Sequence, residues 1–142
     1  MRRAATHALL ILLGAGCALD SGDTSLPPGG TISGTISYTG PAAGGGRPLS
    51  IAVYRTYPPS GPPVAWRLVE EYKFPYHYYF ENLPPGSYTV GASLDVDPAD
   101  TRYLGMLNAK RDPHGYASHG KLVSVDAMHG VGGADLKLED VK

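Results

Sequence analysis

One stretch, from Tyr72 to Asp97, limits what this chain can fold into more than any other. From Tyr76 to Phe80 aromatic side chains recur at every second position, which is the spacing of a strand with one buried face. Residues 82–86, NLPPG, carry the proline and glycine of a tight turn, and residues 87–94 alternate again. Strand, turn and strand in this order predict an antiparallel hairpin at the centre of the protein.

Other segments repeat the alternation, and they cover residues 31–38, 47–57, 64–73, 121–125 and 133–139. The run 64–73 would also suit a helix, but its flanking prolines and its β context favour a strand. Gly34 inside the first run predicts a bulge or the close approach of another backbone. About seven short strands with Gly- and Pro-rich turns predict an all-β fold, a single antiparallel β-sandwich of Greek-key, immunoglobulin-like type.

The string FENLPPGSYTVGA, with ISGTISY and RPLSIAVY before it, resembles the carboxypeptidase regulatory-like and transthyretin-like (prealbumin-like) family. The resemblance covers about residues 31–139 and implies a transthyretin-like sandwich that acts as an accessory domain without catalysis. Hydroxyisourate hydrolases of the same superfold end in Tyr-Arg-Gly-Ser and carry paired histidines. This chain ends in LKLEDVK, so their activity is not implied.

The hairpin corner has a physical explanation of its own. Phe80 and Leu83 are placed to fill the core on either side of the turn. Tyr88 is placed to bury its ring and to return its hydroxyl to a backbone group, as in a tyrosine corner.

The first residues predict export. Arg2 and Arg3 precede an uncharged apolar run, which is too short to span a bilayer as a stable helix. The string LLGAGC then ends in Cys17, the only cysteine, and resembles the lipoprotein signal of bacteria, although Gly14 replaces its usual branched apolar residue. We expect Cys17 to be acylated and to become the mature N-terminus; the alternative is an ordinary signal cleaved near Ala18.

The chain therefore divides into residues 1–17 as lipoprotein signal, 18–30 as flexible tether and 31–142 as the β-sandwich domain. Removal of residues 1–16 takes away two arginines and no acid, which leaves 10 basic against 13 acidic side chains. Because no basic patch is apparent, nucleic acid is not an expected partner. By resemblance to the sorting rule of enteric bacteria, Ala18 after the cysteine favours the outer membrane.

Asp95, Asp97 and Asp100 follow a strand closely, and hard oxygen ligands at alternating positions suit Ca²⁺. Pro98 and Ala99 stand where a calcium loop would have glycine and a ligand, so a solvated acidic turn is the competing interpretation. The loop 95–119 is long enough to be functional.

His114 and His119 share that loop, but their spacing does not force convergence on a zinc ion. His77 and Tyr79 are expected to face outward from their strand and could hold a sugar or a proline-rich peptide. Together with His114 and His119 they are the residues of a possible binding surface. We expect a lipid-anchored binding or structural module of the bacterial cell envelope, with a protein or polysaccharide partner. The sequence carries no catalytic motif; a calcium site or a small hydrolase in the 95–119 loop is the alternative.

Overall fold

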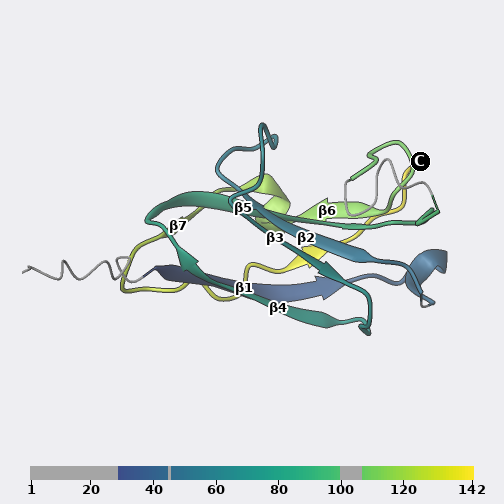
Figure 1. The fold of residues 1–142 in the computed structure, drawn as a ribbon, viewed down its shortest axis with the longest axis horizontal. Helices are drawn as coiled ribbons and strands as arrows, with labels where there is room; N and C mark the ends of the chain where they lie inside the picture. Colours follow the sequence, from purple (N-terminus) through teal and green to yellow (C-terminus); the bar gives the residue numbers. More distant parts are fainter. Residues whose placement is uncertain (1–28, 45, 100–106) are drawn as a thin grey trace, which may run out of the picture.

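The computed structural model describes residues 29–44, 46–99 and 107–142, which form an all-β fold (Figure 1). These residues hold eight strands, two short 3₁₀ turns and no α-helix: β1 (Gly30–Ser37), η1 (Pro41–Ala43), β2 (Leu49–Tyr54), β3 (Ala65–Val69), β4 (Tyr76–Leu83), β5 (Gly86–Leu94), β6 (His114–Tyr116), η2 (Ala117–Gly120), β7 (Val123–Val125) and β8 (Leu136–Lys137). Within these ranges no helix is long and apolar enough to cross a membrane.

The strands form two sheets that lie face to face as two layers (Figure 1). One sheet has the order β4-β1-β8, in which β1 is antiparallel to β4 and parallel to β8. The other has the order β3-β2-β5-β6 with antiparallel neighbours, and β7 pairs with the first residues of β5. The predicted all-β class is therefore confirmed, and the two layers are those of a β-sandwich.

The core lies between the two sheets and takes every second residue of its strands. Since successive side chains of a strand point to opposite faces, the alternation in the sequence decides which residues enter the core. The side chains with no exposed surface include Ile32 and Ile36 of β1, Leu49, Ile51 and Val53 of β2, and Tyr88, Val90 and Leu94 of β5. Burial of each aliphatic side chain stabilises the fold by about 1.5–3 kcal/mol.

The corner between β4 and β5 forms as the sequence predicts. Phe80 and Leu83 are buried, and the hydroxyl of the fully buried Tyr88 donates a hydrogen bond to the carbonyl of Pro84. Asn82 supplies the left-handed backbone of the turn, with φ of 58°. Asparagine tolerates this conformation better than most residues.

Gly34 meets another backbone closely, which confirms the sequence-based prediction. A Cβ at this position would lie 2.3 Å from the carbonyl oxygen of Ala134, so any side chain would push the two segments apart. The ladder between β1 and β4 also shifts register between Gly30 and Ile32. The missing side chain at Gly34 allows the C-terminal segment to lie along β1.

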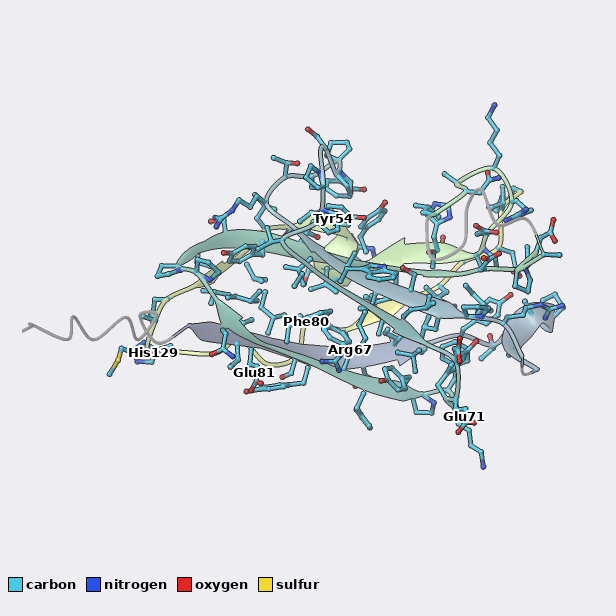
Figure 2. All side chains as sticks on the ribbon, in the orientation of Figure 1. Tyr54, Arg67, Glu71, Phe80, Glu81 and His129 are labelled. Atoms are coloured by element: carbon cyan, nitrogen blue, oxygen red, sulfur yellow. The ribbon has the colours of Figure 1, made fainter. Side chains whose placement is uncertain are left out.

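Arg67 covers the core at one open side of the sandwich. Figure 2 shows Arg67 of β3 and Phe80 of β4 between the two layers, where the guanidinium lies 5.4 Å from the ring centroid. Exposed cation–π contacts of this kind contribute about 0.5–1 kcal/mol. At the opposite side, a bridge between His114 and Glu139 joins β6 to the chain that follows β8.

Candidate binding site

The outer face of the β3-β2-β5-β6 sheet is hollow because its two middle strands carry small residues there. Since the odd-numbered residues of β2 enter the core, Ser50 and Ala52 face outward. In β5 the even-numbered residues enter the core, and Gly91 and Ser93 face outward. The register pairs Ser50 with Ser93 and Ala52 with Gly91, so the four small residues form one continuous floor.

Aromatic residues stand on both sides of this floor. Trp66 of β3 lies opposite Ala52, and Tyr116 of β6 lies opposite Gly91. Trp66, Ala52, Gly91 and Tyr116 therefore form one row across four strands. At the usual spacing between strands, the backbones of the two aromatic residues are about 14 Å apart across the sheet. The Trp66 side chain is half exposed, with 51% of its surface accessible.

The positions of both rings are constrained. The indole Nε1 of Trp66 donates a 2.9 Å hydrogen bond to Oγ of Ser50. The Tyr116 ring leans over Gly91, since a Cβ there would lie 2.7 Å from a ring carbon. Tyr57 packs edge-on against Tyr116 with ring centroids 5.3 Å apart. The rings are thus held in place before any ligand arrives, which lowers the entropic cost of binding.

The resulting groove has a volume of about 580 Å³, within the range of small-molecule sites. Gly61, Pro62 and Pro63 form a further wall. They belong to the loop between β2 and β3, which rises above the sheet in Figure 1; Tyr54 lies at its base in Figure 2. The described lining has no charged side chain: Ser50, Ala52, Tyr54, Gly61, Pro62, Pro63, Trp66, Gly91, Ala92, Ser93, Leu107 and Tyr116.

The tyrosine hydroxyls of the groove are neutral hydrogen-bonding groups. Burial raises the pKa of Tyr54, and burial with the neighbouring hydroxyls of Tyr54 and Tyr57 raises the pKa of Tyr116. Both phenols stay protonated at neutral pH and can each donate and accept a hydrogen bond. The groove therefore offers flat apolar faces with a few uncharged hydroxyl groups.

A second cavity, of about 560 Å³, lies beside β6 and the C-terminal segment. It brings His114 and His119 together, and its other polar lining residues are Ser37, Tyr57, Tyr116, Ser118, Asp135, Lys137 and Glu139. The Nδ1 atom of His114 lies 2.8 Å from the carbonyl oxygen of Asp112. Because a carbonyl only accepts, Nδ1 carries the proton and Nε2 remains for other contacts.

His77 and Tyr79 lie on the other sheet. They face outward from β4 as expected; Tyr79 is 47% exposed, and His77 Nδ1 is 3.1 Å from Oγ1 of Thr35. The structure therefore does not bring them together with His114 and His119. They remain a separate predicted surface.

Asp95 and Asp97, two of the three residues predicted to bind calcium, contact an arginine. The Arg111 guanidinium contacts Asp112 at 2.9 Å, Asp97 at 3.2 Å and Asp95 at 3.4 Å. Asp112 also accepts the backbone N–H of Asn108 at 2.9 Å. The hydrogen bond that Arg111 donates to the Asp112 carboxylate is the main cause that raises the pKa of Arg111. A cation at these carboxylates would have to compete with the guanidinium.

Among the residues that the structure describes, no set of three or more His, Cys, Asp or Glu is grouped so that it could hold a metal ion. Asp100, the third predicted calcium ligand, lies outside the described residues, and so does the predicted acylation site Cys17. The calcium site and the acylation therefore stay predictions.

No protein-family model, curated protein or solved structure matches this chain.

The strand predicted over residues 64–73 includes Trp66, but the sequence analysis did not predict the groove. The sequence feature that could have indicated it is the small size of the outward-facing residues of two strands. These are Ser50 and Ala52 in one strand and Gly91 and Ser93 in the other. Alternation alone does not show that β2 and β5 are neighbours, nor that Trp66 and Tyr116 flank them. That information lies in the sheet order and register.

Proposed function

We propose that this protein is a binding module of the bacterial cell envelope whose groove holds a neutral saccharide. The observation that carries the proposal is the row Trp66, Ala52, Gly91 and Tyr116, in which two constrained aromatic rings flank a floor of small residues. The proposal assigns no catalysis to the chain. A calcium site or a hydrolytic site in the 95–119 loop stays the alternative.

A saccharide fits this lining because a pyranose ring has an apolar C–H face and a rim of hydroxyl groups. The exposed face of Trp66 suits the C–H face, as flat aromatic side chains provide large apolar contact area. The hydroxyls of Ser93, Tyr54 and Tyr116 suit the rim, because each can donate and accept. Since the described lining carries no charge, it favours a ligand without charge.

A proline-rich peptide is the competing ligand, because proline rings also stack in aromatic grooves. Such a peptide presents a row of carbonyl acceptors that need donors. The indole N–H of Trp66 is already donated to Ser50. Because the one indole N–H of the chain is not available to a peptide carbonyl, the groove favours the saccharide over the peptide.

The envelope location rests on the sequence. The basic start, the apolar run and the string ending in Cys17 support an acylated anchor, most consistent with the outer membrane. Several acyl chains would hold the protein firmly, since each buried methylene contributes about 0.8 kcal/mol. Residues 18–30 would then serve as the tether between the lipid and the sandwich.

We also propose a transthyretin-like, Greek-key topology of the carboxypeptidase regulatory-like kind. What supports it is the corner, where Tyr88 returns its hydroxyl to Pro84 beside the buried Leu83. An experimental structure with a different order of strand connections would contradict this topology.

Trp66 is the only tryptophan of the chain, so its fluorescence reports on the groove directly. Residues 18–142 would be titrated with neutral gluco-oligosaccharides and, in parallel, with a proline-rich peptide. We expect a saturable change of emission with the saccharide, and a loss of affinity of at least about tenfold in calorimetry for Trp66→Ala.

The matched control is Tyr79→Ala, which removes a similarly exposed ring from the other sheet. It should leave saccharide binding unchanged. Binding that survives Trp66→Ala but is lost in Tyr79→Ala would move the site to the β4 surface. Binding of the peptide alone would replace the saccharide as ligand.

A further inference from the structure

We infer that the saccharide site continues past Tyr116 into the second cavity, so that the ligand is an oligosaccharide spanning both. This inference rests on the proposed function and deepens it. Tyr116 lines the groove and also lines the second cavity, so its side chain is part of a wall that the two hollows share. A chain longer than one sugar unit can lie across that wall.

Contacts between aromatic rings connect Tyr116 with other residues of the second cavity. The His114 imidazole lies edge-on to the Tyr116 ring, with centroids 6.5 Å apart. Tyr57 packs on the same ring and belongs to the second cavity. Both rings thus contact Tyr116 and line the second cavity, and His114 lies next to Ser93 of the groove floor in the register of β5 and β6.

The chemistry of the two hollows differs in a way that suits successive parts of one ligand. The described lining of the groove is aromatic and without charge, which suits stacking. The second cavity is lined by Asp135, Glu139 and Lys137 together with the two histidines. It therefore offers charged groups of both signs and many hydrogen-bond donors and acceptors. Such a set suits a hydroxyl-rich unit, because each hydroxyl can both donate and accept. Its mixed charges do not select for a ligand of one sign.

The backbone at the second cavity is held in an uncommon conformation. Ser118 and His119 have φ of 51° and 55°, in the left-handed region that non-glycine residues seldom adopt. Both residues line the cavity. Backbone strain of this kind costs about 1–3 kcal/mol and tends to occur where a side chain has a function.

The same conformation supplies a clean test variant. His119→Gly removes the imidazole, and glycine adopts a positive φ without strain, so the variant should fold at least as well as the wild type. Asn82→Gly is the matched control, because Asn82 has φ of 58° in the corner between β4 and β5, outside both linings.

The experiment titrates residues 18–142 with neutral gluco-oligosaccharides from the monosaccharide to the hexasaccharide, followed by Trp66 fluorescence and calorimetry. Affinity should rise with length by at least about tenfold from the disaccharide to the hexasaccharide. His119→Gly should weaken hexasaccharide binding at least about fivefold and leave disaccharide binding unchanged, while Asn82→Gly should change neither.

Affinity that does not depend on length, or a His119→Gly variant that binds the hexasaccharide like the wild type, would overturn the continuous site. Either result, with a saturable Trp66 response, would leave the groove itself as the saccharide site. A Trp66 emission that no saccharide changes would overturn both the groove assignment and its extension.

Discussion

The indole Nε1 of Trp66 and Oγ of Ser50 are joined by a 2.9 Å hydrogen bond that runs diagonally between two strands. In the register of β2 and β3, Trp66 pairs with Ala52 and Ser50 pairs with Leu68. The bond therefore joins Trp66 to the residue two positions before its own partner. Diagonal neighbours of this kind are within reach of large aromatic side chains. The bond fixes the plane of an indole that is otherwise half exposed at the edge of the groove.

Replacement of Ser50 by Ala should weaken saccharide binding about fivefold, because the indole would lose its acceptor and would have to be ordered by the ligand. The unfolding free energy should fall by about 1 kcal/mol. Calorimetry and urea unfolding measure the two effects. The control is Ser124→Ala, which removes an exposed serine hydroxyl of β7 outside both linings and leaves the Trp66 bond in place.

Replacement of Gly91 by Ala should displace Tyr116, since the new Cβ would lie 2.7 Å from its ring. The ring can turn, so we expect the fold to persist with a loss of stability of about 1–3 kcal/mol. Saccharide affinity should fall at least about tenfold, because Tyr116 lines both hollows. Unchanged affinity for every oligosaccharide length would show that the placement of Tyr116 is not required.

Arg111 contacts both a buried carboxylate, Asp112, and an exposed one, Asp97, and the two can be compared directly. Asp112 has 1% of its side chain exposed, and Asp97 has 50%. Asp112→Ala should lower the free energy of unfolding by about 1–3 kcal/mol, because the backbone N–H groups of Asn108 and Val96 would lose the buried carboxylate that accepts their hydrogen bonds. Asp97→Ala should cost less than about 1 kcal/mol. Equal losses in urea unfolding would contradict the assigned difference in burial.

Tyr78 should make the protein sensitive to alkali. Burial is the main cause that raises its pKa, and Asp135 adds to the shift. Because the folded pKa lies above the unfolded one, the stabilising contribution is complete below about pH 10 and is lost as the pH rises toward the folded pKa.

Urea unfolding between about pH 9 and about pH 11 measures this loss, which for one phenol is at most about 1.4 kcal/mol per pH unit. Tyr78→Phe should reduce the slope of the unfolding free energy against pH, although other buried tyrosines keep part of that slope. Tyr79→Phe, at an exposed position, is the control. A steeper slope for Tyr78→Phe would contradict a raised pKa of Tyr78 in the folded protein.

Replacement of Cys17 by Ser should release the protein from the membrane fraction, because the side chain that would carry the acyl groups is removed. Detergent phase partition and labelling with a radioactive fatty acid measure this. A wild-type protein that takes up no label, or that is equally soluble with either residue, would favour the ordinary cleaved signal. The control is Ala18→Ser, which leaves the cysteine in place.

Much of the sandwich could be predicted because strand alternation is a local property. The outward and inward sets of β2 and β5 followed from their period of two, and the corner at Leu83 followed from its proline and glycine. The loop after Leu94 was less predictable. Its Asp residues predicted either a calcium site or a solvated acidic turn, and Arg111, which contacts Asp95 and Asp97, is distant from them in sequence.

The sequence by itself determined the all-β class, the buried face of each main strand and the core position of Tyr88, because each depends on neighbours within a few residues. The tertiary structure alone decided that Trp66 and Tyr116 share one row over Ala52 and Gly91. That row needs the order and register of four strands drawn from distant parts of the chain. Register follows from the packing of the whole sheet, so no single segment encodes it.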